Sequence, residues 1–223
     1  MSAARARPAA GGGRWVEVAP ERLERWLAGF AERHGGAGWV VQDGVVTVTG
    51  TDEATATCHP PFPPLVTDPT LPYAGLLAHA LTDRRVGVLL LRRGGHAAGI
   101  FDGAALVASK VGTRHVQGRT AAGGWSQHRF ARRREGQTQV ALLAAADVAA
   151  RVLVAEATPP VDHLVTGGDR ALLSQVLQDP RLALLRPLVS ERVLDVPDPK
   201  LTVLSATPAV FRAVRILMRD SQG

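Results

Sequence analysis

A continuous apolar run at residues 86–91 constrains the fold of this chain more than any other feature of its sequence. The run reads VGVLLL and is followed by two arginines and two glycines. Apolar runs of this length without alternation are typical of strands that are buried on both faces. Such a strand requires packed layers on both sides, so the sequence predicts an α/β protein with helices flanking a sheet.

The segments after this run alternate between strand and helix patterns. Residues 96–103 and 105–112 follow at hairpin spacing, which predicts a meander and therefore a mixed β-sheet. The later candidates are a long alanine-rich helix at 138–157, a buried strand at 161–168, a helix at 169–179 with Asp169 as N-cap, a short helix and a strand within 181–199, and a closing helix within 201–220.

The N-terminal part has a different pattern and predicts a separate unit. Pro20 is placed to begin a helix, and Asp43-Gly44 is a strong turn signal between two β-branched runs. The next segment, HPPFPPLVTDPTLP, is too rich in proline to be a helix or a central strand. The predicted parts are a flexible tail at 1–13, a small α+β unit at 14–58, a proline-rich linker at 59–72 and a larger α/β domain at 73–223.

Several classes of protein are disfavoured by the composition. The single cysteine, Cys58, allows neither an internal disulfide nor a cysteine-based zinc cluster, and no clustered His/Cys motif or phosphate-binding loop is found. We therefore expect no metal and no cofactor. The most apolar long stretch, residues 140–157, is interrupted by Asp147, Arg151 and Glu156, which argues against a membrane-spanning helix. With no apolar signal segment visible, we expect a cytoplasmic, soluble protein.

The positive charge is concentrated in one segment. The net charge is +6, and residues 103–134 contain seven cations and no acid, so the rest of the chain nets to −1. The cations are Lys110, Arg114, Arg119, Arg129, Arg132, Arg133 and Arg134. A solvated charged loop is the simple alternative, but arginine is suited to bidentate phosphate contacts. The segment therefore predicts binding to a polyanion, with nucleic acid as the usual partner.

The same segment contains the strongest candidate for chemistry. Gly123 and Gly124 allow close backbone approach to a partner, and Gln127 offers an uncharged amide donor and acceptor. Such a loop is incomplete as an active site alone, so we expect it to enter a site that another molecule supplies. Three histidines flank the segment and are expected to face the loop or RNA; they are His96, His115 and His128.

Residues 123–134, GGWSQHRFARRR, resemble the GGQSxxRFARxR motif in the middle domain of eukaryotic and archaeal class I peptide release factors. The glycine pair, Ser126 and the run 129–132 are in register. Trp125 stands where that family has its glutamine, and Gln127 follows two residues later. This spacing resembles the Vms-type ribosome quality-control peptidyl-tRNA hydrolases, and the actinobacterial Vms-like release factor group is the closest fit.

The resemblance covers the chain from about Tyr73 onward and implies a release-factor middle-domain-like fold with a ribonuclease H-like layer topology. It implies a ribosome-associated peptidyl-tRNA hydrolase whose loop enters the peptidyl-transferase centre of the large ribosomal subunit and cleaves the peptide–tRNA ester there, in the rescue of stalled ribosomes. Gln127 would position water, and backbone N–H groups near Gly123 and Gly124 would support the oxyanion. Gln117 is the second-choice catalytic amide. The implied RNA-binding residues are Arg119, Trp125, Arg129, Arg132, Arg133 and Arg134.

The implied partners are the large ribosomal subunit, peptidyl-tRNA and rRNA, and we expect a monomer whose segment 112–136 is mobile. Two alternatives stay open. One is a non-catalytic ribosome- or RNA-binding module of the same fold, because the glutamine is displaced from its usual place. The other is a metal-dependent nuclease, for which Asp102 and Asp162 are the candidate carboxylates, although each is more simply a turn or strand-edge residue.

Overall fold

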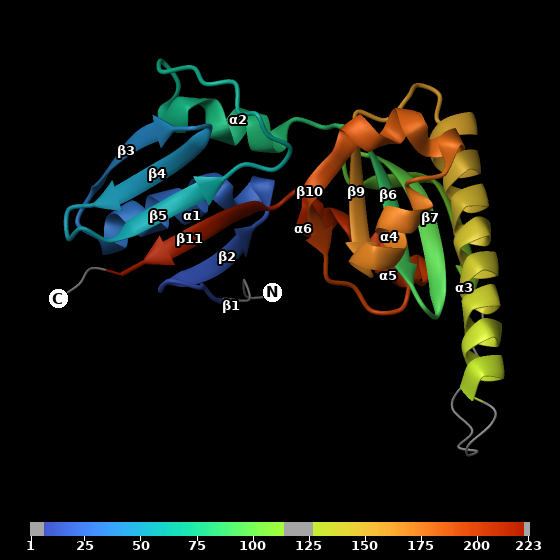
Figure 1. The fold of residues 1–223 in the computed structure, drawn as a ribbon. Coiled ribbons are helices and arrows are strands. Elements are labelled where there is room, and N and C mark those ends of the chain that lie inside the picture. The colour runs from blue at the N-terminus through green and yellow to red at the C-terminus, as the bar shows by residue number, and fades with distance from the viewer. Residues whose placement is uncertain (1–6, 114–126, 221–223) are drawn as a thin grey trace. The chain divides into compact units, whose positions relative to one another are not determined.

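The structure is a computed structural model that describes residues 7–113 and 127–220, with backbone only for residues 113 and 127–137. The chain divides into two compact units (Figure 1). The first unit contains the described residues up to Thr82 and those from Pro208 onward, and the second runs from Asp83 to Thr207. Each unit has its own sheet and its own hydrophobic core.

The first unit is an antiparallel sheet in the order β1-β2-β11-β5-β4-β3, with helices packed on it. Its strands are β1 (Arg7–Pro8), β2 (Arg14–Val18), β3 (Ala37–Gln42), β4 (Val45–Gly50), β5 (Thr55–His59) and β11 (Val214–Arg219). Its helices are α1 (Pro20–Arg33), the 3₁₀ turn η1 (Pro72–Gly75), α2 (Leu76–Leu81) and α6 (Pro208–Phe211). The core lies between the helices and one face of the sheet.

Local sequence signals explain two of these elements. Helix α1 begins with Pro20 at its first position and buries Leu23, Leu27 and Phe30 completely, because these residues recur on one helical face. The β3–β4 hairpin turns through two residues, Asp43 and Gly44, with φ of 51° and 73°. Both angles are positive, as a type I′ hairpin turn requires. The predicted helix and hairpin are therefore confirmed.

Both ends of the chain differ from the sequence prediction. Residues 7–13, expected within a flexible tail, form a hairpin in which Arg7 pairs with Trp15; residues 1–6 lie outside the described residues. The closing helix expected within 201–220 is wrong: the chain forms α5 (Leu201–Ser205), α6 and then strand β11. Strand β11 pairs with β2 and β5, so the final segment completes the N-terminal sheet. Burial in that sheet overrides the helix propensity of its leucine, methionine and arginine residues.

The proline-rich segment also belongs to the first unit. Leu65 is buried in the core of that unit, and the ring of Phe62 lies 6.0 Å from that of Phe211. The Nε2 atom of His79 lies 2.8 Å from the carbonyl oxygen of Pro61. The compact units therefore divide after Thr82, whereas the sequence predicts a linker at 59–72 and a domain that begins at Tyr73.

The second unit is a five-stranded mixed sheet in the order β10-β9-β6-β7-β8. Its strands are β6 (Arg85–Arg92), β7 (Gly95–Asp102), β8 (Ala105–Thr113), β9 (His163–Gly168) and β10 (Val189–Leu194). The first three strands along the chain are antiparallel neighbours, whereas β9 and β10 run parallel to β6. Numbered along the unit, the order is 5-4-1-2-3, so the predicted mixed sheet with a ribonuclease H-like topology is confirmed.

Helices cover both faces of this sheet, which explains the apolar run of β6. Leu89 and Leu91 belong to the core beneath helix α3 (Gln127–Ala150) and the following π-helical turn η3 (Arg151–Ala155). On the opposite face, Leu204 of α5 packs closely above Gly99 of β7. The remaining helices are α4 (Arg170–Val176) and the 3₁₀ segment η4 (Pro180–Leu188). Every residue of β6 from Val86 to Leu91 is buried, as its sequence predicts.

Candidate functional site

The glycine- and arginine-rich motif connects strand β8 to helix α3. Strand β8 ends at Thr113 and α3 begins at Gln127. Among the predicted site residues, Gln117, Arg119, Gly123, Gly124 and Trp125 lie outside the described residues. The other predicted residues fall in the first turns of α3, where the backbone alone is described; they are Gln127, Arg129, Arg132, Arg133 and Arg134.

Helix α3 begins eleven residues earlier than its alanine-rich sequence suggests. The segment 112–136, predicted to be mobile, therefore includes helical backbone from Gln127 onward, while residues 114–126 lie outside the description. Arginine is among the better helix formers, so an arginine-rich stretch continues a helix readily. The roles of the motif residues remain predictions.

The first part of α3 extends beyond the sheet of the second unit (Figure 1). Among the residues whose side chains are described, Thr138, Gln139 and Val140 are exposed and Leu142 is the first to be buried. At 1.5 Å per residue, the helix from Gln127 to Leu142 spans about 20 Å. The start of α3 thus lies well ahead of Leu142, the first buried residue among those of the helix whose side chains are described.

A close-packed interface anchors the rest of α3. Leu142, Ala145, Ala146 and Ala149 are buried against the sheet in the core of the second unit. Alanines at helical spacing let the helix approach the strands closely, so the orientation of the helix is held by contact along its length. The stretch Thr138–Ala155 is long and apolar enough to cross a membrane by length and composition, and one third of it is buried within the protein.

An arginine bridge ties α3 to the segment after α4. The Arg181 guanidinium lies 2.7 Å from Oδ1 of Asp147 on α3 and 2.7 Å from Oδ2 of Asp179. Hydrogen bonds from the Arg181 side chain and backbone lower the pKa of Asp179 to about 2, and the same carboxylates raise the pKa of Arg181. Asp179 also receives the backbone N–H of Arg181, so it caps η4.

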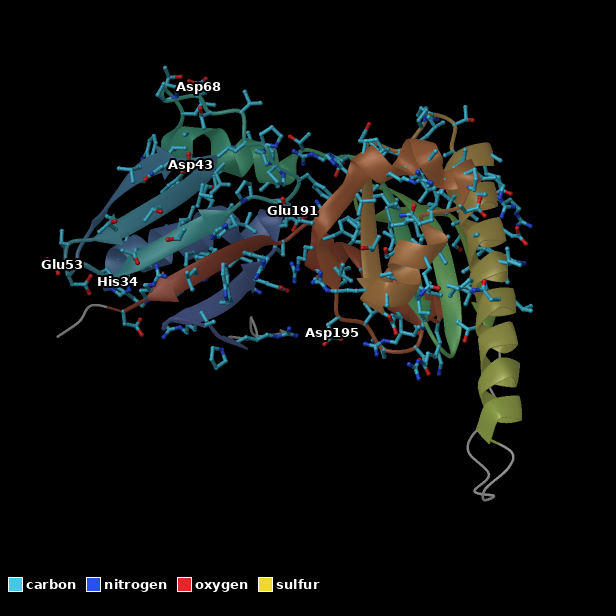
Figure 2. The ribbon with its side chains drawn as sticks, viewed as in Figure 1. His34, Asp43, Glu53, Asp68, Glu191 and Asp195 are labelled. Carbon is cyan, nitrogen blue, oxygen red and sulfur yellow. The ribbon has the colours of Figure 1, made fainter. Side chains whose placement is uncertain are left out.

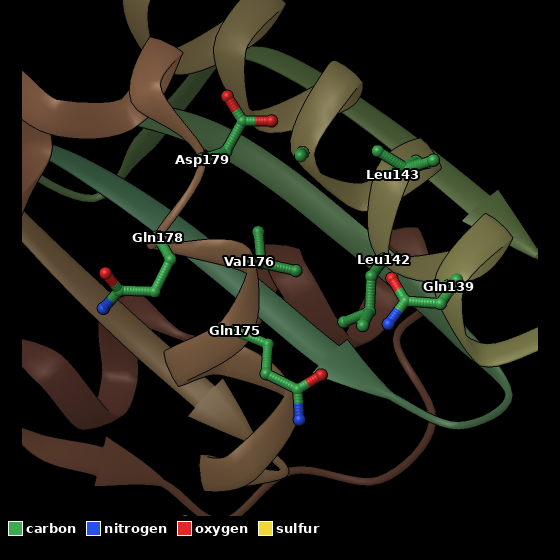
Figure 3. A pocket seen from close by; sticks show the side chains of 8 residues that line it. Gln139, Leu142, Leu143, Gln175, Val176, Gln178 and Asp179 are labelled. Carbon is green, nitrogen blue, oxygen red and sulfur yellow. The ribbon is translucent and has the colours of Figure 1, made fainter. Parts of the chain in front are cut away.

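A groove of about 350 Å³ separates α3 from α4 and the start of η4 (Figure 3). Its floor is apolar, with Leu142 and Val176, and three neutral amides line it: Gln139, Gln175 and Gln178. The carboxylate of Asp179 at its edge is held by Arg181. The groove therefore offers hydrogen-bonding amides without an available acid, base or nucleophile among its described lining residues.

The strand that leads into the motif is paired tightly with its neighbour. Thr113 and Gly112 of β8 lie opposite Gly95 and His96 of β7. His96 is buried, with 8% of its surface exposed, and its imidazole occupies the space where a Cβ on Gly112 would be. The expectation that His96 faces the loop or RNA is therefore wrong, because its ring packs across β8. The side chains of His115 and His128 lie outside the described residues.

Strand β8, which leads into the motif, ends at the edge of the sheet where the three parallel strands end. The pairing aligns Thr113 with Gly95 and Arg92, and Leu91 with Gly168 at the end of β9. Arg92 binds Asp195 at 3.1 Å after the end of β10, and it also donates to the carbonyl oxygen of Val196. Asp195 is labelled in Figure 2.

Asp169, at the same edge, caps helix α4. Its side chain accepts hydrogen bonds from the backbone N–H groups of Ala171 at 3.0 Å and Leu172 at 3.2 Å. The predicted N-cap is therefore confirmed. Both this carboxylate and that of Asp195 are engaged by groups within the second unit.

The two carboxylates considered for a nuclease lie at the opposite edge of the sheet. Asp102 binds the guanidinium of Arg85 at 2.6 and 2.8 Å, and Asp162 accepts the backbone N–H of Arg85 at 2.9 Å. Within residues 7–113 and 127–220, no group of three or more His, Cys, Asp or Glu side chains is arranged to hold a metal ion. Asp102 therefore forms an ion pair at a strand end, and Asp162 accepts a backbone hydrogen bond at the start of β6.

The sequence did not predict the side-chain contacts that hold strand β8 and helix α3, the two elements on either side of the motif. Gly112 and His96 are sixteen residues apart, and Arg181 and Asp147 are thirty-four apart. No local pattern marks such pairs, because they are created by the alignment of β7 with β8 and by the packing of η4 against α3. The strand alignment was predictable from the hairpin spacing, and the side-chain contacts were not.

A family model matches the second unit and continues into strand β11. The model of a family described as Actinobacteria/chloroflexi VLRF1 release factor matches residues 84–217, which is well over half of the chain. No functionally curated protein has a detectable match to the sequence.

Two solved structures match the chain at low similarity. The crystal structure of the archaeal translation termination factor aRF1 has 18% identity and a TM-score of 0.44, with 76% of this chain and 49% of that chain covered. A structure described as an archaeal protein has 16% identity and a TM-score of 0.31, with 74% and 50% covered. The chain spans about half the length of each of these proteins.

Proposed function

The chain belongs to the Actinobacteria/chloroflexi VLRF1 release factor family, and from that premise we propose that it is a ribosome-associated peptidyl-tRNA hydrolase acting in the rescue of stalled ribosomes. Membership of a release factor family indicates a role in translation termination or rescue at the ribosome. The finer activity, the site residues and a location in the cytoplasm are parts of the proposal.

The observation that carries the proposal is the sequence GGWSQHRFARRR at the projecting start of α3. The helix that bears the motif begins about 20 Å ahead of Leu142, the first buried residue among those of α3 whose side chains are described, and a motif at such a helix end can reach into a narrow site on another molecule. Glycines minimise the bulk of the entering backbone, and arginines compensate the charge of surrounding phosphates.

In the proposed mechanism, the side-chain amide of Gln127 holds a water molecule against the ester that joins the peptide to the terminal ribose of tRNA. The water attacks the ester carbonyl carbon, the carbonyl oxygen gains negative charge, and the bond to the ribose oxygen breaks. The peptide leaves with a carboxyl group, and the ribose oxygen regains a proton as a hydroxyl group. An uncharged amide can orient the water without itself titrating.

Backbone groups provide the second element of the mechanism. The first N–H groups of a helix have no partner within the helix and lie at the positive end of its dipole. Because α3 begins at Gln127, these groups belong to the motif itself. Together with N–H groups near Gly123 and Gly124, they would stabilise the developing oxyanion. The arginines Arg119, Arg129, Arg132, Arg133 and Arg134 would bind tRNA or rRNA phosphates, and Trp125 would stack on a base.

The test is single-turnover peptide release from purified stalled ribosome–nascent-chain complexes. We expect Gln127→Ala to slow release by about 10²-fold or more, the usual effect of removing one positioned donor. Gln139→Ala is the matched control, since Gln139 is an exposed glutamine on the same helix, twelve residues further along. Gln117→Ala tests the second-choice amide, and sedimentation with ribosomes measures binding separately. Full activity of Gln127→Ala with loss in Gln117→Ala would assign the chemistry to Gln117.

The second candidate function is a ribosome-binding module without hydrolysis, and Trp125 favours it because it occupies the glutamine position of the resembling release factors. This alternative predicts that the wild-type protein sediments with ribosomes and releases nothing. It also predicts that Trp125→Gln, which restores the GGQ sequence, gains release activity. Release by the wild-type protein that depends on Gln127 excludes this alternative.

A further inference from the structure

One face of the sheet in the first unit is left outside its core. The buried residues of β2, β4, β5 and β11 alternate with partly exposed ones, as expected for a sheet with one packed face. Helix α1 lies behind these strands in Figure 1. On β3, Val40 points away from the core and is 62% exposed. We call the face opposite the core the open sheet face; it includes Arg7, Trp15, Thr57, His59, Arg215 and Arg219.

The strand register places these residues on the same side. Arg7 is opposite Trp15, and Trp15 is opposite Leu217 in the centre of the sheet. Arg215 is opposite His59, and Leu217 is opposite Thr57. Residues directly opposite in antiparallel strands share a face, and so do alternate residues along one strand. None of these side chains belongs to the buried core of the unit.

An aromatic cluster lies at the centre of this face. The guanidinium carbon of Arg215 lies 4.3 Å from the centroid of the Trp15 ring, within the range of a cation–π contact. The rings of Trp15 and His59 lie 5.2 Å apart, inclined at 56°. Burial and the charge of Arg215 lower the pKa of His59, which favours its neutral imidazole. The cluster thus presents a half-buried indole that is held in place by two neighbours.

Cations and hydroxyl groups surround the cluster. Arg7 and Arg219 are exposed near the ends of their strands, and Glu17 is the acid that lies opposite Arg215. Threonines form two opposite pairs, Thr47 with Thr57 and Thr49 with Thr55. The Thr47 hydroxyl donates to the Thr57 hydroxyl at 3.5 Å. The face therefore combines a stacking ring, excess positive charge and short hydroxyl side chains on a rigid sheet.

We propose that the open sheet face binds a segment of single-stranded RNA, with a base stacked at Trp15 and phosphates contacted by Arg7 and Arg219. Bases of any identity stack on aromatic side chains displayed on a sheet, and flanking arginines bind the backbone. Threonine hydroxyls match the 2′-hydroxyl groups that distinguish RNA from DNA. The positive charge of the face favours an anionic occupant over a basic one. Its rows of hydroxyl groups favour a polar ligand over an apolar protein surface.

The proposal does not depend on the motif of the second unit, so its test removes the motif cations. The starting protein is the full chain with Arg132, Arg133 and Arg134 replaced by alanine. The probe is a fluorescein-labelled single-stranded RNA of about 12 nucleotides, within the usual range of site sizes. Fluorescence anisotropy is measured over a range of salt concentrations, with DNA of the same sequence as a second probe.

We expect this starting protein to bind the RNA. Trp15→Ala should weaken binding by about tenfold or more, the usual effect of losing one stacked base, and Trp15→Phe should retain most of the affinity. Arg219→Glu should also weaken binding, and Arg219→Ala should reduce the slope of log K against log salt by roughly 0.7 for one lost phosphate contact. Arg25→Glu is the matched control, because Arg25 is an exposed arginine of helix α1.

Several results would overturn the proposal. One is the absence of RNA binding by the starting protein, and another is an equal effect of Arg219→Glu and Arg25→Glu. Circular dichroism checks that Trp15→Ala is folded; if it is not, the arginine pair decides the question. Concentration-dependent dimerisation that Arg219→Glu abolishes would assign the face to a second copy of the chain. Equal affinity for DNA would remove the role of the threonines, and with it the assignment to RNA. If the starting protein does not bind RNA while the wild-type protein still releases peptide in a Gln127-dependent way, the RNA-binding proposal is wrong and the proposed hydrolase activity stands.

Discussion

Replacing Gly112 by alanine tests how the strand that enters the motif is held. A Cβ on Gly112 would lie 2.5 Å from Cε1 and 3.1 Å from Cδ2 of the buried His96 imidazole. Carbon atoms pack most favourably at about 3.5–4.0 Å, so the new methyl group overlaps the ring by about 1 Å. His96 is 8% exposed, so displacement of its ring must disturb the neighbouring strand pairs.

Two opposing effects set the size of the change. Overpacking of this kind destabilises by about 1–3 kcal/mol. Alanine in place of glycine within a strand recovers about 0.5–1 kcal/mol through the lower entropy of the unfolded chain. We therefore expect a net loss of about 1–2 kcal/mol, which corresponds to a lower midpoint of thermal unfolding by roughly 3–5 °C per kcal/mol for a unit of this size.

The assay is urea-induced unfolding followed by circular dichroism and by tryptophan fluorescence. Three of the four tryptophans, Trp15, Trp26 and Trp39, lie in the first unit, so fluorescence mainly reports that unit. Gly112→Ala should shift the circular dichroism transition of the second unit. Gly38→Ala is the control: Gly38 lies in a strand where an added Cβ meets nothing within 4 Å, so that substitution should be neutral or slightly stabilising.

A double-mutant cycle decides whether the overlap is the cause. In a His96→Ala background the imidazole is gone, and Gly112→Ala should lose most of its destabilising effect. Wild-type stability of Gly112→Ala, or an equal loss in both backgrounds, would refute the proposed clash. It would mean that the entry to the motif is held by other contacts than the packing of His96 across β8.

Three further changes test other contacts in the structure. The pKa of Asp179 is lowered to about 2, so its contribution to stability is fully present above the unfolded-state pKa of about 3.9 and is lost as the pH falls towards 2. Asp179→Asn should remove that part of the acid dependence of the unfolding midpoint, measured at each pH. An unchanged acid profile in the variant would contradict this. Asp169→Ala should destabilise the second unit by about 0.5–2 kcal/mol in urea unfolding through loss of the α4 cap, whereas Asp169→Asn should lose little; equal losses would show that the cap is unimportant. The pKa of Asp52 is lowered mainly by its hydrogen bond with His34, 2.8 Å away at the end of α1 (Figure 2). His34→Ala should therefore raise the pKa of Asp52. An NMR titration of Asp52 that is unchanged in the variant would contradict this.

The parts of the fold that the sequence predicted correctly are those encoded by neighbouring residues. The unbroken apolar run identified β6 as a strand buried on both faces, and hairpin spacing identified β7 and β8 as its antiparallel neighbours. The Asp43-Gly44 turn and the Asp169 cap depend on single side chains and backbone angles within a few residues. Such signals act before any tertiary contact forms.

The features that were not predictable depend on distant partners. Strand β11 contains good helix formers, but its alternate residues Val214, Ile216 and Met218 complete a core made by strands far earlier in the chain. A short strand of this kind is recognised only when its partner strands are known. The family was recognisable from twelve residues of the motif, because they combine glycines, a serine and arginines at fixed spacing.

The position of β11 has a consequence for how the protein folds during synthesis. The strand lies between β2 and β5, so the sheet of the first unit lacks a central member until residues 214–219 have been made. The second unit is a continuous stretch, Asp83–Thr207, that is complete earlier. Domains that emerge first normally fold first. Here the order is reversed, because the later stretch is complete before the N-terminal stretch up to Thr82 has gained its last strand. Translation that stops short of Val214 therefore yields a complete second unit attached to a sheet with unpaired strand edges, which favour aggregation.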